Sequence, residues 1–404
     1  MKSTKKRIPI ILGICIPIIL IFFVVFVIIF GFPMPTRKHV AVTVDNSYRN
    51  YYIGYGADVT GGDGTLFFRS YNRSPFSNGI YQIDSNIARR VYREGFSLTP
   101  SVPFAPYVFN GKLIDVKDGK ICSLNFLNGE LEPFLNPPLK DKEYVEEVFT
   151  SGGELYYADS SQNIYHYIDD KTMDIVASRE MCGNNYITCD VCDNTMYYYF
   201  DDNKSSKSVP NDYNGELYDC NIRKIYEYDL SERKQKRCID FSCIDDELPQ
   251  KNCALDDFYV AENQVYLIVK KLERLDDHYS KEVIEYDSML QDIGYAEKMI
   301  IYRYDISTGK LKKIADFDDA AIHINGYGSN VYMKVVTENN YGYYAELVNK
   351  LYSFSADSDQ PILLPAEKSI DELYIFDEEW LYYTTTSNKL YRIHPDGSNN
   401  ECVF

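Results

Sequence analysis

The chain is predicted to be an all-β protein: a β-propeller of seven four-stranded blades, with six as the alternative, preceded by one N-terminal transmembrane helix. Two observations predict the propeller. A short apolar strand rich in Tyr, followed by a β-hairpin, recurs seven times along the 404 residues. Upstream of most of these pairs lies a further short strand. Four strands per unit, repeated radially, make the blades of a propeller.

The hairpin at residues 301–314, IYRYDISTGKLKKI, shows the repeated unit most clearly. Its first strand is rich in β-branched and aromatic residues, which suit a pleated and half-buried surface. Asp305 is expected to begin the turn by accepting hydrogen bonds from nearby backbone amides, and Gly309 is expected to adopt a positive φ. Related hairpins begin at Ile80, Ile121, Ile164, Ile225, Leu351 and Leu390.

The apolar strands that precede these hairpins recur at blade-like intervals. Their first apolar residues, which are 47, 42, 41, 69, 66 and 50 positions apart, are Leu66, Leu113, Leu155, Met196, Val265, Val331 and Leu381. A four-stranded blade takes roughly 40–50 residues. The long intervals come from insertions at residues 201–224 and 271–299, and a smaller insertion lies at 337–350. All three fall between the second and third strands of their units, so they are expected to open on one face of the ring, where binding loops usually lie.

The second insertion is expected to contain a helix at residues 281–293. Val283, Tyr286, Leu290 and Ile293 follow the spacing of one apolar helical stripe. Ser280 suits the N-cap and Gly294 the end of the helix. The stripe either packs on the rim of the propeller or docks a partner.

The N-terminus is predicted to anchor the chain in a membrane. Residues 1–7 carry four basic residues and form a short cytoplasmic tail, and residues 8–32 run for 25 positions without a charge. A transmembrane helix needs about 20 apolar residues. A cleaved signal peptide is the alternative, but its apolar core is usually roughly 7–15 residues long. Residues 33–54 form either a stalk or a ring-closing strand, and residues 55–404 form the propeller.

Topology and charge limit the partners. The basic tail predicts a single-pass protein of the plasma membrane, with a cytoplasmic N-terminus and an extracytoplasmic propeller. Without the tail, 38 basic residues face 60 acidic residues. Such a surface repels phosphate backbones and anionic lipid head groups, so a nucleic-acid partner is not expected.

The cysteines suggest disulfides in one irregular region. The seven candidates for disulfides are Cys182, Cys189, Cys192, Cys220, Cys238, Cys243 and Cys253. An exported location permits such staples, and this window coincides with the first insertion. A zinc site at Cys189 and Cys192, with Cys182 and Cys220, is the alternative, but the second CxxC pair of a zinc ribbon is absent. We therefore predict no metal and no cofactor.

The sequence offers no catalytic motif. It contains no HExxH, GxSxG, P-loop or DxDxDG pattern, so no catalytic residue is predicted. Acid pairs such as Asp256-Asp257 are common, but adjacent acids on a strand are expected to point to opposite faces. The central pocket of a propeller could still bring acids from several blades together, as glycosidases require.

Tyrosines of the three insertions are the predicted binding residues. Tyrosine suits recognition because it offers a large, fairly rigid contact with a polar tip. The candidates are Tyr213, Tyr218, Tyr279, Tyr286, Tyr341, Tyr343 and Tyr344. The alternative is that these rings pack the insertions against one another.

The repeated units resemble bacterial membrane-anchored propellers of domain of unknown function 5050. These are similar to the YWTD propellers of low-density-lipoprotein-receptor relatives. Tyr156-Tyr157-Ala158-Asp159 comes closest to the YWTD motif, and the strands that begin at Leu66, Val265 and Val331 lack its Asp. The resemblance implies a binding scaffold without enzymatic activity, although YWTD propellers usually have six blades.

Three functions are compatible with the sequence. The first is a membrane-anchored binding or sensing module for a protein, peptide or glycan of the cell envelope. The second is an exported enzyme of lyase or glycosidase type with a site in the central pocket. The third is an accessory subunit that organises a membrane complex.

Overall fold

A computed structural model describes most of the propeller. It covers residues 38–42, 58–62, 64–70, 78–93, 107–140, 142–178, 187–192, 194–200, 224–241, 253–273, 281, 296–318, 320–341, 344–354, 360–367, 370–375 and 378–404. The predicted transmembrane segment at residues 8–32 lies outside these ranges. Among the helices of the described residues, none is long and apolar enough to cross a membrane.

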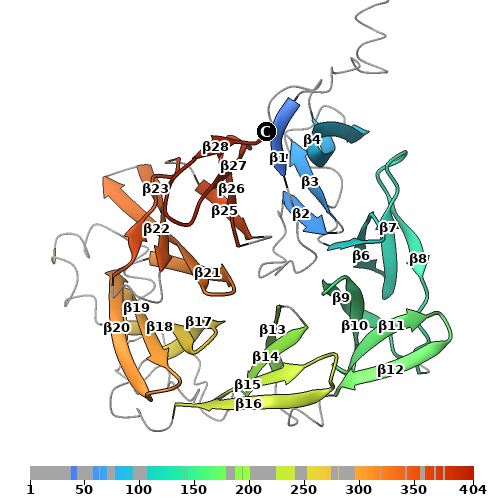
Figure 1. Cartoon of the computed structure of the whole chain (residues 1–404), viewed down its shortest axis with the longest axis horizontal. Coiled ribbons are helices and arrows are strands. Elements are labelled where there is room, and N and C mark those ends of the chain that lie inside the picture. The colour runs from blue at the N-terminus through green and yellow to red at the C-terminus, as the bar shows by residue number, and fades with distance from the viewer. Residues whose placement is uncertain are drawn as a thin grey trace, which may run out of the picture.

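Seven antiparallel four-stranded sheets form a ring in chain order, one sheet per blade (Figure 1). We label the strands of a blade a to d from the axis outward. Blades 1 to 3 contain β2 (Val59–Gly62), β3 (Thr65–Ser70), β4 (Gly79–Arg93) and β1 (Lys38–Val42); β5 (Tyr107–Phe109), β6 (Lys112–Lys117), β7 (Lys120–Leu124) and β8 (Leu131–Leu135); and β9 (Val145–Ser151), β10 (Glu154–Asp159), β11 (Ile164–Asp169) and β12 (Thr172–Ala177).

Blades 4 to 7 follow the same order. They contain β13 (Ile187–Cys192), β14 (Thr195–Phe200), β15 (Lys224–Asp229) and β16 (Lys234–Asp240); β17 (Cys253–Ala261), β18 (Gln264–Glu273), β19 (Ala296–Asp305) and β20 (Lys310–Asp318); β21 (Ala320–Tyr327), β22 (Asn330–Tyr341), β23 (Tyr344–Phe354) and β24 (Ile362–Leu363); and β25 (Ile370–Ile375), β26 (Leu381–Thr385), β27 (Leu390–Ile393) and β28 (Glu401–Cys402). Seven blades, rather than the alternative of six, are therefore confirmed.

Blade 1 is built differently from the other six. Its β4 has 15 residues and would span about 45 Å if straight. The strand instead folds back on itself, since a Cβ on Gly79 would lie 2.0 Å from the carbonyl oxygen of Tyr92. The hairpin expected from Ile80 onward is therefore present inside β4. Outside it, β1 pairs with β4, Lys38 opposite Ile87. Residues 38–42 thus join the first blade.

The predicted turn chemistry is present in the c–d hairpins. The Asp305 carboxylate accepts hydrogen bonds from the backbone N–H groups of Ser307 (2.9 Å) and Thr308 (3.0 Å). Gly309 adopts a φ of 67° and donates its N–H to the Asp305 carbonyl. Asp229 makes the corresponding contacts with Ser231 and Glu232. These local interactions explain why the sequence marks each hairpin so clearly.

Aromatic and aliphatic side chains fill the spaces between the blades. Each neighbouring pair of blades shares residues of one hydrophobic cluster. The largest fully buried side chains include Tyr157, Tyr165, Tyr266, Tyr332, Tyr382 and Tyr383. The chain has 38 Tyr, 21 Phe and one Trp, and tyrosine supplies most of the buried aromatic side chains among the described residues.

Blades 7 and 1 close the ring by side-chain contacts, and the C-terminus lies close to β1 and β28 (Figure 1). The Phe404 ring packs against the rings of Phe68 and Tyr81, with centroids 4.9 Å and 4.6 Å apart. The buried Asn388 amide donates to a carboxylate oxygen of Asp58 (3.1 Å) and to the Arg69 carbonyl (3.2 Å). A polar latch inside an aromatic cluster therefore joins the two ends of the propeller.

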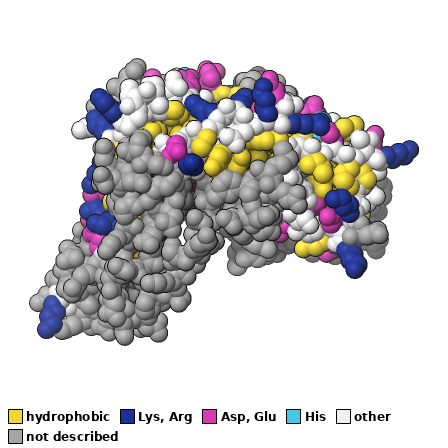
Figure 2. Space-filling model, turned by 90° about the horizontal axis from the view of Figure 1, so that it is seen from below, with side chains coloured by type: hydrophobic (Ala, Val, Ile, Leu, Met, Phe, Trp, Pro, Cys, Tyr) yellow, Lys and Arg dark blue, Asp and Glu magenta, His cyan; other side chains and the backbone are white. Residues whose placement is uncertain are grey.

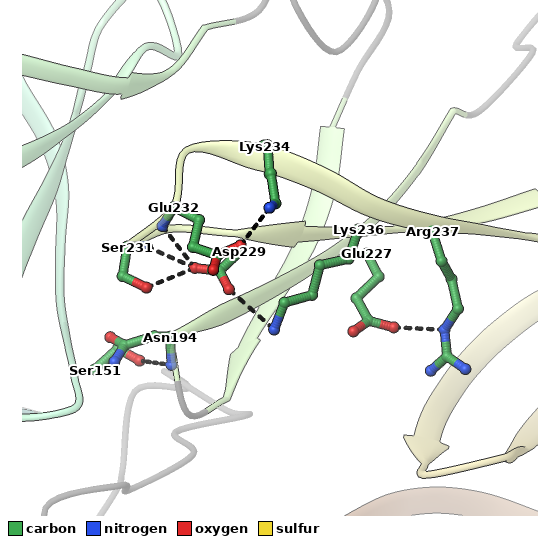
Figure 3. A network of polar contacts seen from close by, with 9 residues as sticks. All are labelled: Ser151, Asn194, Glu227, Asp229, Ser231, Glu232, Lys234, Lys236 and Arg237. Atoms are coloured by element: carbon green, nitrogen blue, oxygen red, sulfur yellow. Dashed lines mark hydrogen bonds and ion pairs between the residues drawn. The ribbon is translucent and has the colours of Figure 1, made fainter.

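The rim at blade 4 carries basic side chains that are neutralised locally. The ammonium group of Lys236 lies 3.0 Å from a carboxylate oxygen of Asp229, and the Arg237 guanidinium lies 2.6 Å from Glu227 (Figure 3). Lys234 is paired in the same way with Glu232 at 2.7 Å. Seen edge-on, the described part of the rim shows Lys and Arg interspersed with Asp and Glu (Figure 2).

Candidate functional site

The connections between strands b and c differ sharply around the ring. In blade 2 a two-residue turn links Lys117 to Lys120, and blades 3 and 7 need only residues 160–163 and 386–389. Blades 4 and 5 use residues 201–223 and 274–295 for the same connection. The three insertions therefore follow strand b in consecutive blades, as predicted. We call the face on which these connections open the b–c face, and the opposite face the c–d face.

In blade 6 the insertion continues the sheet. Strands β22 and β23 stay paired from Val331 opposite Phe354 to Tyr341 opposite Tyr344. Tyr341 and Tyr344 thus lie at the tip of a hairpin that prolongs the sheet on the b–c face. The other predicted binding tyrosines, Tyr213, Tyr218, Tyr279, Tyr286 and Tyr343, lie outside the described residues. Lys281 is helical, and residues 282–293 of the expected helix also lie outside the described residues.

Ionisable residues recur at one level of the a strands, which are the innermost strands of the ring (Figure 1). In four blades they lie eight positions before the first apolar residue of strand b: Asp58, Glu147, Asp257 and His323. The strand pairing agrees, because Glu147, Asp257 and His323 each face the fourth residue of that apolar run. Strand a begins at the b–c face, so this level lies near that face, below the insertions, and we call it the channel mouth.

Bulges interrupt several of the a strands next to these acids. The register of strand a shifts at Glu146 in blade 3, at Asp256 in blade 5 and at Asp371 and Glu372 in blade 7. A bulge interrupts the alternation of side chains and often re-aims one of them. Glu146 and Glu147 are both exposed as a result, although adjacent acids are expected to point to opposite faces. In blade 5 the expected alternation holds, with Asp256 exposed and Asp257 buried.

The surroundings of these groups shift their protonation. Burial raises the pKa of Glu147, and the nearby Glu146 raises it further. Burial also raises the pKa of Glu372, partly offset by Lys334. For His323, burial and the positive charge of Lys334 lower the pKa, while Asp256 opposes them.

A chain of polar contacts connects three blades at this level. The Lys334 side chain is almost fully buried, and its ammonium group donates to the Asp371 carbonyl and lies 3.7 Å from a carboxylate oxygen of Glu372. Lys270 lies 3.7 Å from Asp256 and 3.4 Å from Glu297. Asp257 accepts the backbone N–H of Ile324 at 3.3 Å. Blades 5, 6 and 7 are therefore joined by contacts between charged and polar groups, and blade 3 lies across the ring from blades 6 and 7 (Figure 1).

The described cysteines test neither the predicted disulfides nor the alternative zinc site. Cys189 and Cys192 lie on β13, Cys238 is an exposed free thiol on β16, and Cys253 is buried on β17. Cys182, Cys220 and Cys243 lie outside the described residues, so the staples stay a prediction. No group of three or more His, Cys, Asp or Glu is arranged to hold a metal among the residues with a described position.

Sequence reasoning missed the mouth residues Glu147, His323, Lys334 and Glu372. It considered an axial pocket but could not say which residues line it. One signal was available: an ionisable residue eight positions before strand b recurs in blades 1, 3, 5 and 6. In blade 7 the bulge shifts Glu372 to nine positions before Leu381.

Comparison with known proteins assigns no family to this chain. No family model matches the chain, and no curated relative matches. A chain of the S. cerevisiae complex of dbp5 with nup159, gle1, IP6 and ADP is 8% identical, with a TM-score of 0.40, and the match covers 88% of this chain and 97% of that one. The resemblance to YWTD propellers stays a prediction.

Two further solved structures are similar to this chain to a comparably low degree. Oligogalacturonate lyase in complex with manganese is 9% identical, with a TM-score of 0.36 and coverage of 86% and 95%. The Nup133 β-propeller domain of Vanderwaltozyma polyspora is 10% identical, with a TM-score of 0.34 and coverage of 77% and 87%. Likeness at this level carries no argument about ligand or chemistry.

Proposed function

We propose that this chain is a membrane-anchored, extracytoplasmic propeller that binds or senses a protein, peptide or glycan of the cell envelope on its b–c face. It acts as a recognition module without enzymatic activity. Residues 8–32 anchor it, and the tyrosines of the insertions, with the charged channel mouth, supply the contacts.

The asymmetry of the b–c connections carries the proposal. Blades 2, 3 and 7 close these connections with short turns, whereas blades 4, 5 and 6 lengthen them side by side. Long loops on a rigid scaffold are where binding sites usually lie. The acidic pairs and His323 gather at the mouth on this same face, so shape and charge mark one region.

The test replaces Tyr341, Tyr343 and Tyr344 together by Ala in the full-length protein. Binding of purified cell-wall muropeptides should weaken by about 2 kcal/mol or more, as for a hot spot, while the melting temperature stays unchanged. The control Leu127→Ala alters a 95% exposed side chain on the c–d face and should bind like the wild type. An early-melting triple variant that still binds would make these tyrosines scaffold and refute the binding role.

Anchoring has its own test. Protease added to intact cells should digest residues 55–404 and spare the membrane segment, because the basic tail places the propeller outside. A protected propeller, or a mature N-terminus that begins after Phe32, would contradict the anchored topology.

A propeller enzyme of lyase or glycosidase type is the second candidate. The raised pKa of Glu147 and of Glu372 and the lowered pKa of His323 favour it, since perturbed groups in a concave site are frequently catalytic. Turnover of cell-wall glycan that Glu147→Gln or Glu372→Gln abolishes, with binding retained, would favour this candidate. Absence of turnover by the wild-type protein would exclude it for that substrate.

A further inference from the structure

Blade 6 leaves most of its third strand without a partner on the outer side. β23 has 11 residues, whereas β24 has two and pairs only with Tyr352 and Ser353. In blades 2 to 5 the third and fourth strands have nearly equal lengths, as in blade 5 with 10 residues in β19 and 9 in β20. Among the described residues, no strand continues beside β23 beyond Leu351 on that side. We call the stretch from Ala345 to Asn349 the open edge.

The hydrogen bonds of β23 show which backbone groups face the open edge. The Leu364 N–H donates to the Leu351 carbonyl (2.8 Å), so the backbone groups of Leu351 point outward. Successive residues of a strand direct their N–H and C=O groups alternately to its two sides. Those of Asn349, Leu347 and Ala345 therefore also point outward, and no described strand lies opposite them.

The open edge lacks the features that usually keep an edge strand from pairing. Natural edges are short, bulged or interrupted by Pro. β22 and β23 instead keep one register, without a bulge, from Val331 opposite Phe354 to Tyr341 opposite Tyr344, and β23 contains no Pro. Beyond Thr337, where the described pairing of β21 with β22 ends, the hairpin has only two strands. A two-stranded hairpin is marginally stable in water, so a further strand would stabilise it.

We propose that the open edge binds an extended peptide segment of the envelope ligand, which adds a strand beside β23. This inference rests on the proposed function and narrows it to a peptide or an extended segment of a protein. An extended peptide carries N–H and C=O groups at the same alternation as Ala345, Leu347 and Asn349, so it satisfies all three residues. It lies on the b–c face, along the hairpin that forms the third insertion.

The size of the open edge favours a peptide over a second copy of this chain. Five strand residues span about 17 Å, and a sheet is about 10 Å thick, so the edge offers about 170 Å². A stable protein–protein interface takes about 800 Å² from each partner. Pairing of two copies through this edge alone therefore falls well short, whereas a single added strand matches its length.

Proline substitutions on the two sides of the hairpin test the added strand. Leu347→Pro removes one outward N–H and no hydrogen bond between β22 and β23, since the Leu347 backbone faces away from β22. Asn340→Pro is the matched control, because by the same alternation the Asn340 N–H points to the inner side of the hairpin. Pro is tolerated at such edge positions, so both variants should melt close to the wild-type temperature.

The probe is a peptide selected on the full-length protein from a random library of about twelve residues, long enough to cover the open edge. Leu347→Pro should weaken its binding by about tenfold or more, because one hydrogen bond is lost and the proline ring obstructs the added strand. Asn340→Pro should bind it like the wild type. No binding peptide, unchanged binding to Leu347→Pro, or equal loss in both variants would overturn the proposal.

N-methylation of the selected peptide tests the pairing on the wild-type protein. Methyl groups on alternate residues should abolish binding in one register and be tolerated in the other, because only every second N–H faces β23. Equal effects in both registers would overturn strand addition. A dimer in light scattering that Leu347→Pro dissolves would make a second copy the occupant. Muropeptide binding that needs Tyr341, Tyr343 and Tyr344 but not the open edge would reject the added strand and keep the proposed function.

Discussion

At the scale of single residues, the channel mouth holds charge at an energetic cost. Glu147 has a raised pKa because the surrounding protein removes water and Glu146 lies beside it. A carboxyl whose folded pKa lies above the unfolded value destabilises the fold at every pH above the unfolded value. Such a cost is common at sites whose charge serves a ligand or a reaction.

Glu147→Gln should therefore raise the melting temperature at neutral pH. The gain should shrink as the pH falls and vanish below about pH 4, where the unfolded carboxyl is also protonated. Glu372→Gln should also raise stability at neutral pH, because burial raises the pKa of Glu372 as well, but by less, since the substitution also removes the acid 3.7 Å from the buried Lys334 ammonium. Melting curves between pH 4 and 8 check both. A pH-independent effect of Glu147→Gln would contradict the electrostatic reason.

At the scale of elements, the YWTD-like Asp closes a turn inside its own blade. The fully buried Asp159 carboxylate accepts the backbone N–H groups of Ser161 and Asn163, both at 2.9 Å, and the Tyr165 hydroxyl at 2.8 Å. One side chain thus fixes the b–c turn of blade 3 and orients a tyrosine of strand c. This explains how the turn stays short where blades 4 to 6 insert long segments.

Asp159→Ala should destabilise the protein by about 2–3 kcal/mol, because it leaves several buried donors without their acceptor. Tyr165→Phe removes only one of these hydrogen bonds and should cost about 1 kcal/mol. Urea denaturation followed by circular dichroism measures both. An Asp159→Ala variant within about 0.5 kcal/mol of the wild type would show that the turn does not depend on this carboxylate.

The strands and hairpins could be predicted because their sequence signals are local. The pairing of β1 and the residues at the channel mouth could not be predicted, because they depend on contacts between distant parts of the chain. Alternation and turn residues such as Asp305 and Gly309 act within a few positions, so the hairpins and the sites of insertion followed from the sequence. The pairing of β1 with β4 depends on contacts nearly 50 positions apart, which left residues 33–54 open between a stalk and a closing strand. Predicting which residues lie at the channel mouth requires the register of all seven a strands. A bulge changes that register by one residue, and the sequence does not reveal where a bulge occurs.

At the scale of the whole molecule, a polar latch at Asn388 helps to join the two ends of the ring, together with the Asp58 N–H that donates to the Tyr374 hydroxyl (3.1 Å). Asn388 has a φ of 53° and donates to both Asp58 and the Arg69 carbonyl of blade 1. The sole tryptophan, Trp380, belongs to the hydrophobic cluster shared by blades 7 and 1. Its fluorescence therefore reports on ring closure.

Asn388→Gly keeps the backbone conformation and removes the latch, so it should cost about 1–2 kcal/mol. Asn388→Ala should cost about 1 kcal/mol more, because Ala tolerates a positive φ poorly. In both variants the Trp380 signal should be lost before the circular dichroism of the sheets. Simultaneous loss at the wild-type temperature would show that the aromatic contacts of Phe404 close the ring without the latch.

The central claim is that the b–c face, with its insertions and charged mouth, is where the ligand binds. Hydrogen exchange of the full-length protein, with and without saturating cell-wall muropeptides, tests it most directly. If the ligand binds there, protection should increase in β14, β18, β22, β23 and the connections between them, and should not change in the c–d turns or the outer strands. Protection confined to the c–d turns or the outer strands, or no protection despite measurable binding, would contradict it.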